Sequence, residues 1–237
     1  GRQSVLLLFA DTKMEDEDLY RFLLETVAEM GVELVRLADG RTPWEVFKDE
    51  RYIGNSRVDP CSKMLKRHLC FQWLKNNCDP KETVVCLGLD WTEVHRMDRA
   101  APYWKPWAVR APMCEEPYVT KLEMLAALQE IGIAPPRLYD MGFSHNNCGG
   151  FCVKAGQSQF RLLLSTMPES YAEHERQEEE LRRYLEKDVA ILRRIIQGKA
   201  VPLTLRQLRL EVEQKAREGN SPVAEDDWGG CGCFVDV

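Results

Sequence analysis

The stretch Ser-Val-Leu-Leu-Leu-Phe-Ala-Asp-Thr, residues 4–12, contains an uninterrupted apolar run from Val5 to Ala10. Such a run is typical of a strand that is buried on both faces, as strands of a parallel sheet are. Acidic residues and then apolar residues at helical spacing follow, which predicts a helix that Gly31 ends. Residues 32–37 predict the next strand, so the chain opens as strand, helix and strand.

A second unit of the same kind lies further along the chain. Residues 61–77 have helical periodicity, and residues 83–88 predict another buried strand. Alternating strands and helices favour a parallel sheet with right-handed crossovers, in which ligands bind at the carboxyl ends of the strands. We therefore expect two strand ends to share one rim of the sheet. The residues that follow these ends are Asp11, Thr12, Gly88, Leu89 and Asp90.

The remaining segments are less uniform. Residues 99–120 predict irregular structure, and residues 119–131 predict a helix. A long charged helix is expected from 168 to 197, packed on its own domain or on another subunit of a homo-oligomer. Thr204 predicts the N-cap of a last helix, where Gln207 completes a capping box.

The composition is that of a globular protein. Of the 237 residues, 44% are hydrophobic, yet no apolar run approaches the roughly 20 residues of a membrane-spanning helix. No secretory signal is visible, which predicts a cytoplasmic protein without a membrane partner. The net charge of −6 argues against a protein that coats nucleic acid, although it allows a local basic patch.

Nine cysteines in a chain without a secretory signal indicate thiol chemistry or metal ligation rather than a disulfide framework. Cys148 and Cys152 lie in one glycine-containing loop, and Cys231 and Cys233 lie in another. Two such pairs supply soft ligands for zinc, copper or an iron–sulfur cluster. The alternatives are that either pair is a redox dithiol or consists merely of small loop residues. Cys61 lies at a predicted helix start, where the helix dipole favours a thiolate that could ligate a cluster or act as a nucleophile. A plain structural role for Cys61 is equally open.

Other residues near the predicted site carry weaker signals. Arg96, beside His95 after a predicted strand, is a candidate clamp for phosphate or sulfate, because its guanidinium can donate two hydrogen bonds to a tetrahedral oxyanion. His145 is interpreted as a hydrogen-bonded loop residue rather than a metal ligand. Cys86 is expected to be buried within a strand. The cysteines expected to be structural are Cys70, Cys78, Cys86 and Cys114.

These motifs, in this order, resemble the adenine nucleotide α-hydrolase superfamily, the PP-loop ATP pyrophosphatases. The stretches that carry the resemblance are residues 7–12, 59–66, 87–96 and 138–143, the last of these ahead of Cys148. Within the superfamily they are similar to the phosphoadenosine-phosphosulfate (PAPS) reductase-like proteins of phages and bacteria. The similarity covers residues 4–165.

The resemblance implies an α/β fold with a five-stranded parallel sheet, flanking helices and a helical C-terminal extension. It divides the chain into a nucleotide-binding domain, 1–165, and an extension with a cysteine-containing tail, 166–237. The residues that it implies for binding ATP or a related adenine nucleotide are Asp11, Thr12, Gly88, Leu89, His95 and Arg96. It also implies that Cys61 joins Cys148 and Cys152 around an iron–sulfur cluster, with zinc as the alternative. Cys231 and Cys233 either complete this metal site or supply a mobile catalytic thiol.

The chain departs from the family at both ends. The family opens with a strand and a Ser-Gly-Gly-x-x-Ser phosphate loop, which this sequence lacks, so we expect the first strand and loop upstream of Gly1. The family's reductases end in a Glu-Cys-Gly-Leu-His type of tail, whereas this chain has Gly-Gly-Cys-Gly-Cys-Phe at residues 229–234.

Three functions follow from these expectations. The first is sulfur chemistry on an adenine nucleotide, by sulfonucleotide reduction or by adenylation-coupled sulfur transfer, with Cys231, Cys233 and Arg96 as catalytic residues. Its partner is a sulfur donor or a thioredoxin-like reductant. The second is a non-catalytic binding or regulatory module with structural zinc. The third is a component of a nucleic-acid modification system, against which the negative charge weighs.

Overall fold

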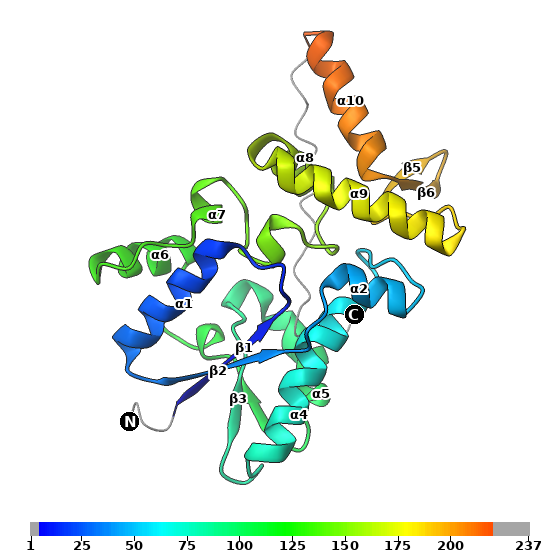
Figure 1. The fold of residues 1–237 in the computed structure, drawn as a ribbon. Coiled ribbons are helices and arrows are strands. Elements are labelled where there is room, and N and C mark those ends of the chain that lie inside the picture. Colours follow the sequence, from blue (N-terminus) through cyan, green and yellow to red (C-terminus); the bar gives the residue numbers. More distant parts are fainter. Residues whose placement is uncertain (1–4, 220–237) are drawn as a thin grey trace.

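The computed structural model describes residues 5–219 of the chain (Figure 1). Its opening elements have the predicted order: β1 (Leu6–Asp11), α1 (Glu17–Met30) and β2 (Glu33–Ala38). The two strands pair in parallel, and Asp11 lies opposite Ala38 where both strands end. Gly31 adopts a left-handed conformation, with a φ of 61°, and ends α1 as predicted.

The helix predicted at 61–77 is present but not uniform. It consists of α3 (Pro60–Ser62), a π-helical turn (Lys63–Arg67) and α4 (His68–Asn77). Turns of this kind widen a helix locally and are frequent at functional sites. Lys66 and Arg67, which lie on the turn, are both buried, so this helix brings positive charge into the protein.

A second pair of parallel strands follows, β3 (Val84–Cys86) and β4 (Ala108–Arg110). β3 confirms the strand predicted at 83–88, but Cys86 is exposed, so its predicted burial is wrong. The irregular structure predicted for 99–120 is wrong in part: that segment contains β4 and much of α5 (Met97–Tyr103), whereas residues 115–120 lie in no helix or strand. Trp104 and Trp107 are buried in a shared core, and this packing orders a segment whose local pattern has no period.

The predicted five-stranded parallel sheet is wrong. The strands within residues 5–219 form three separate two-stranded sheets: β1–β2, β3–β4 and the antiparallel hairpin of β5 (Leu192–Ile196) with β6 (Lys199–Leu203). An apolar run does not specify how many strands pair, and the run of β1 is itself only partly buried, with Leu6 37% exposed. β3 and β4 contain three residues each, so they offer few hydrogen bonds to a further strand.

The C-terminal part of the described chain is helical around that hairpin. Its helices are α8 (Gln157–Thr166), α9 (Pro168–Leu185) and α10 (Leu205–Arg217). The single helix predicted from 168 to 197 is wrong beyond α9, because Glu186 turns the chain with a φ of 53°. Gln197 and Gly198 have φ angles of 49° and 75°, which suit the tight turn of a β-hairpin. Thr204 caps α10 in a capping box with Gln207, as predicted.

Two buried clusters hold these elements together. The first joins α2 (Pro43–Asp49) to α8, α9 and α10, so the apolar face of α9 packs on its own chain. The second lies around β1, α4 and α5. Figure 1 shows α8, α9, α10 and the hairpin at one end of the molecule, with β1 to β3 at the other. The two remaining α-helices of the described chain are α6 (Lys121–Glu130), which confirms the helix predicted at 119–131, and α7 (Arg137–Asp140); three short 3-10 helices are at Trp91–Arg96, Pro112–Cys114 and Cys148–Gly150.

Candidate functional site

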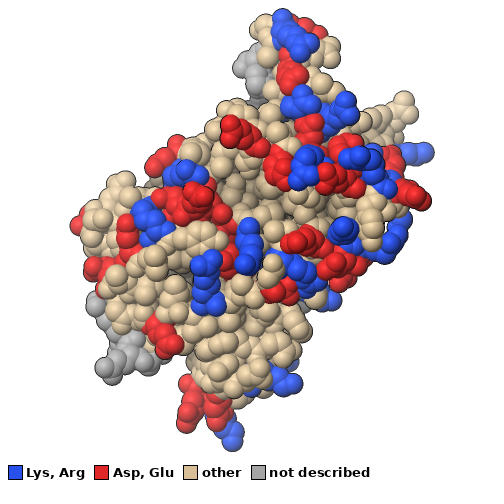
Figure 2. Space-filling view, in the orientation of Figure 1, with Lys and Arg blue, Asp and Glu red and all other residues tan. Residues whose placement is uncertain are grey.

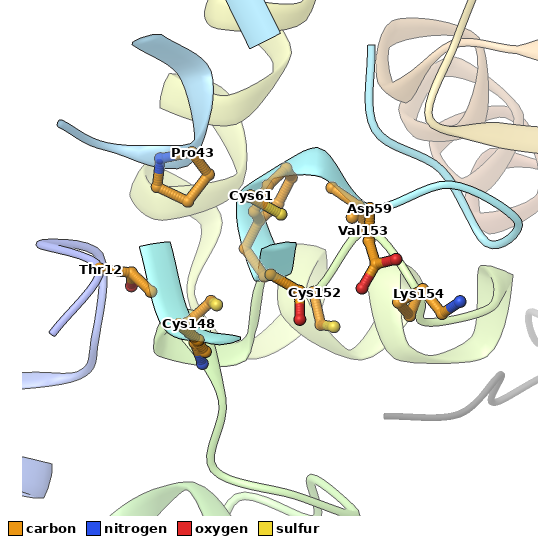
Figure 3. Close-up of a pocket in the computed structure, with 11 residues that line it drawn as sticks. Thr12, Pro43, Asp59, Cys61, Cys148, Cys152, Val153 and Lys154 are labelled. Carbon is orange, nitrogen blue, oxygen red and sulfur yellow. The ribbon is translucent and has the colours of Figure 1, made fainter. Parts of the chain in front are cut away.

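A small pocket lies where β1 ends, beside the start of α2 (Figure 3). Three cysteines line it, Cys61, Cys148 and Cys152, together with Thr12 and two lysines. The pocket has a volume of ≈ 20 Å³, room for about one water-sized group and far less than an adenine nucleotide occupies. The structure therefore brings the three described cysteines of the predicted metal set to one cavity, and Thr12 with them.

Glycine allows the cysteine loop to approach the segment after β1. Gly149 and Gly150 have φ angles of 60° and 84°, which residues with a Cβ rarely adopt. A Cβ on Gly149 would lie 2.9 Å from the carbonyl oxygen of Met14, closer than such atoms can come. Cys148 itself has a φ of 49°, so its side chain is presented from a strained backbone position.

One buried carboxylate ties the elements of the pocket together. The side chain of Glu15, 2% exposed, accepts hydrogen bonds from the Thr12 hydroxyl at 2.9 Å and from the Cys148 backbone N–H at 2.7 Å. The ammonium of Lys66 lies 3.4 Å from the same carboxylate. Glu15 thus connects the end of β1, the cysteine loop and the helix that carries Cys61. The sequence pattern assigns Glu15 only to an acidic run before a helix, so no local signal reveals this role.

The wall of the pocket contains buried charge of both signs. Asp59, Lys66 and Lys154 are 7%, 6% and 7% exposed. Burying a charge is costly unless another group compensates it. The Lys154 ammonium makes no hydrogen bond to any residue in the range 5–219. In Figure 3 the nitrogen of Lys154 points away from the three cysteines, so its charge does not face the space between them.

Asp11 anchors the strand pair instead of lining the pocket. It is 1% exposed and accepts hydrogen bonds from the Lys13 backbone N–H at 2.8 Å, from Tyr20 at 2.9 Å and from Arg36. Burial acts to raise the pKa of Asp11, but these hydrogen bonds outweigh it and hold the pKa below its usual value. Burial and the Asp11 carboxylate raise the pKa of Tyr20 to about 12. The predicted nucleotide contact of Asp11 remains a prediction.

The other predicted nucleotide-binding residues are not among those that line the cysteine pocket. Gly88 and Leu89 follow β3, and the Leu89 carbonyl accepts a hydrogen bond from the Cys114 thiol at 3.3 Å. His95 is exposed, and Arg96 pairs with Glu93 on the same helical turn. The structure therefore places Thr12 with the thiols and leaves residues 88–96 apart from that pocket.

The cysteines suit a soft metal by their chemistry but do not form a ligand group as they lie. Figure 3 shows the sulfurs of Cys61, Cys148 and Cys152 separated from one another around the pocket. Within residues 5–219, no three Cys, His, Asp or Glu side chains are gathered closely enough to hold a metal ion. Cys231 and Cys233, predicted to complete the site, lie outside the described residues. The composition of the donor set fits a thiolate-bound centre that would need these sulfurs to converge.

No protein-family model matches this chain, and neither do any of the curated proteins or solved structures with which it was compared. The resemblance to PAPS reductase-like proteins thus remains a prediction from the order of the motifs. Among the described residues, no helix is long and apolar enough to cross a membrane.

Proposed function

We propose that this protein is an enzyme of sulfur chemistry whose cysteine thiolates act on a substrate linked to an adenine nucleotide. The observation that supports this function best is that Cys61, Cys148 and Cys152, from distant segments, line one pocket with two buried lysines. Thiolates are strong nucleophiles, and buried ammonium groups attract sulfonate or phosphate oxygens. We place the protein in the cytoplasm, where thiols are kept reduced.

In the reductive version, a thiolate attacks the sulfur of a sulfonucleotide. The S–O bond to the nucleotide breaks, the nucleotide leaves with the electron pair, and the cysteine carries a sulfonate. A second thiolate then attacks the sulfur of that cysteine, which releases sulfite and forms a disulfide. An external dithiol reduces the disulfide, so two electrons from the dithiol end in sulfite. Because the pocket is small, only the sulfonate end enters, and the nearest positive charge on the helix of Cys61 is that of Lys66.

Sulfur transfer to an adenylated acceptor is the other version of the same proposal. A cysteine persulfide, formed by a donor of sulfane sulfur, attacks the acceptor with its outer sulfur, and AMP leaves with the electron pair of the bond that it shared with the acceptor. A second thiolate then attacks the cysteine sulfur of the mixed disulfide, which releases the thiolated acceptor and forms a protein disulfide that the external dithiol reduces. Where an iron–sulfur cluster is bound, Cys61, Cys148 and Cys152 would hold it, and the attacking thiolates would be those of Cys231 and Cys233, the predicted catalytic cysteines. A bound cluster would supply positive iron beside an anionic substrate.

The volume of the pocket favours a second candidate function. A cavity of ≈ 20 Å³ that excludes a nucleotide suits a binding or regulatory module in which the cysteines hold structural zinc. In that case the chain catalyses no reaction, and loss of the metal unfolds the cysteine loop.

Two measurements on the full chain, purified without oxygen, distinguish the sulfur enzyme from the zinc-binding module: metal analysis and an activity assay. For sulfur chemistry we expect iron with broad visible absorption, and sulfite or AMP release from a sulfonucleotide or ATP in the presence of dithiol. Cys61→Ser and Cys148→Ser should lose both signals, while Cys86→Ser, at an exposed site, should keep both. Stoichiometric zinc without product would support the module. Turnover that survives both pocket substitutions would disprove a role for these thiols.

A further inference from the structure

A second and much larger cavity lies away from the cysteine pocket. Its volume is ≈ 300 Å³, at the lower limit of the pockets that bind small ligands. Three segments form it: the residues that follow α2, the turn after α9, and the two strands of the hairpin. All of these segments lie within the described chain and none of them contributes a residue to the predicted nucleotide site.

The polar wall of this cavity is positively charged. Arg51, Lys187 and Arg193 line it, and Asp188 is its only acidic residue. The Asp188 carboxylate is already paired with Arg182, at 3.0 Å. The half-buried Arg193 side chain makes no hydrogen bond or ion pair with any residue of the described range. A guanidinium in this state can donate two hydrogen bonds to a phosphate.

The cavity also offers an aromatic ring on an apolar background. Tyr52 is 40% exposed, and its hydroxyl accepts a hydrogen bond of 3.0 Å from the Asn55 side chain. Asn55 is 3% exposed and accepts from the backbone N–H of Arg57 at 3.0 Å, so the ring stands on a fixed support. Leu185 and Pro202 add apolar surface to the cavity. A flat aromatic ring beside apolar side chains is the usual surface on which a nucleobase stacks.

We propose that this cavity binds one nucleotide unit, with its base against Tyr52 and its phosphate at Arg193 and Lys187. The volume accommodates one such unit, and the charge and the aromatic wall correspond to its two halves. The unit can belong to a free nucleoside monophosphate or to a single strand, since both present the same chemistry. Figure 2 shows acidic and basic side chains interspersed over the face that it displays, and such a surface does not favour a long contact with a strand.

The connecting segment 51–61 contributes to both cavities of the molecule. Arg51 and Tyr52 line the larger one, whereas Asp59 and Cys61 line the cysteine pocket. Between them the Asn55 N–H donates to the Val58 carbonyl at 2.8 Å and holds the bend. The nucleotide site does not depend on the chemistry proposed for the thiols, and its occupant would lie on the same segment as Cys61.

Calorimetric titration of the full chain with AMP, adenosine and inorganic phosphate tests this site. We expect AMP to bind more tightly than either fragment. Arg193→Gln and Lys187→Gln should weaken AMP at least about tenfold, as should Tyr52→Leu, which should leave inorganic phosphate unaffected. Arg217→Gln, with a side chain 82% exposed at the end of α10, is the matched control and should bind AMP normally.

Further arms identify the source and separate this site from the thiol proposal. An oligoadenylate that binds at least about tenfold more tightly than AMP identifies a strand, and equal or weaker binding identifies the free nucleotide. Cys61→Ser should bind AMP like the unmodified chain even where it abolishes sulfur chemistry. The proposal would be overturned if AMP did not bind. It would also be overturned if the Lys187→Gln variant and the Tyr52→Leu variant both bound AMP as tightly as the unmodified chain.

Discussion

Glu15 accepts a hydrogen bond of 2.7 Å from the backbone N–H of Cys148, which lies 133 residues further along the chain. The same carboxylate lies 3.4 Å from Lys66, on the helix that carries Cys61. Two of the three cysteines of the pocket therefore depend on one acidic side chain for their relative position. This contact makes Glu15 the first residue to test by substitution.

Glu15→Gln should destabilise the protein by about 1–3 kcal/mol, because the amide keeps the size of the side chain but removes the charge beside Lys66. Urea unfolding measures the loss. Glu17→Gln is the control, since Glu17 is exposed in the first turn of α1. An equal loss of stability in the two variants would show that Glu15 does not stabilise the contact between the cysteine loop and the helix of Cys61.

The close approach at Gly149 predicts a second loss of stability. Gly149→Ala should cost about 1–3 kcal/mol, because the new Cβ meets the Met14 carbonyl and the backbone must keep a positive φ. Gly132→Ala separates the two causes, because Gly132 has a φ of 79° but nothing within 4 Å of its Cβ position. We expect the Gly132 variant to lose clearly less stability in the same urea measurement. A Gly149 variant as stable as the Gly132 variant would mean that the loop can move away from Met14.

Local signals in the sequence were sufficient for the ends of several elements. Gly31 ends α1, and Thr204 with Gln207 begins α10, because each of these signals acts within a single turn of backbone. Strand partners are not local, so the apolar run of β1 could not reveal that β2 is its only partner within residues 5–219. The turn at Gln197-Gly198 carries a hairpin signal that the charged helical pattern before it obscured.

In the candidate site too, the sequence reveals the local signals but not the contacts between distant residues. The cysteine loop and Cys61 are recognisable because cysteine is rare and glycine beside it is informative. Glu15 and Lys154 belong to patterns that usually lie on the surface, and only the folded chain shows that they are buried. The second cavity has no motif at all, because its wall combines residues 51–55 with the distant residues 185–202.

His174 predicts a loss of stability in acid. The Trp44 indole N–H donates to Nδ1 of His174 at 3.1 Å, which requires a neutral ring. Burial lowers the pKa of His174 from 6.5 to about 4, against the opposing effect of Glu173. The folded state therefore binds this proton less well than the unfolded chain does. The contribution of neutral His174 to the free energy of unfolding is fully present above pH 6.5 and is lost as the pH falls toward 4.

We expect this loss to reach about 3 kcal/mol at the acid end of that range. Urea unfolding at a series of pH values measures it. His174→Phe retains a ring to stack on Phe151 and should flatten this part of the profile. A variant with the acid dependence of the unmodified chain would show that His174 does not titrate on unfolding.

Glu178 predicts a pH dependence of the opposite sign. Burial raises the pKa of Glu178 from 4.5 to about 7, although the backbone N–H groups of Ile191 and Leu205 donate to its carboxylate at 3.0 Å and 2.6 Å. Because the pKa of Glu178 is higher in the folded state, its contribution to the free energy of unfolding is present below pH 4.5 and is lost as the pH rises toward 7. The free energy of unfolding of Glu178→Gln, measured relative to that of the unmodified chain, should therefore increase by about 2–3 kcal/mol as the pH rises across this range. Glu180→Gln, an exposed residue of the same helix, should gain nothing.

The cysteines outside the pocket predict an order of chemical reactivity. Cys86 is exposed, whereas Cys70 is 4% exposed and its burial raises the pKa of the thiol to about 11. Because the thiolate is the reactive form, iodoacetamide at pH 8 should label Cys86 more than about tenfold faster than Cys70. Mass spectrometry of the digested protein resolves the two sites, and labelling in urea should remove the difference. Fast labelling of Cys70 in the folded protein would contradict its burial against β1, on which the second core cluster depends.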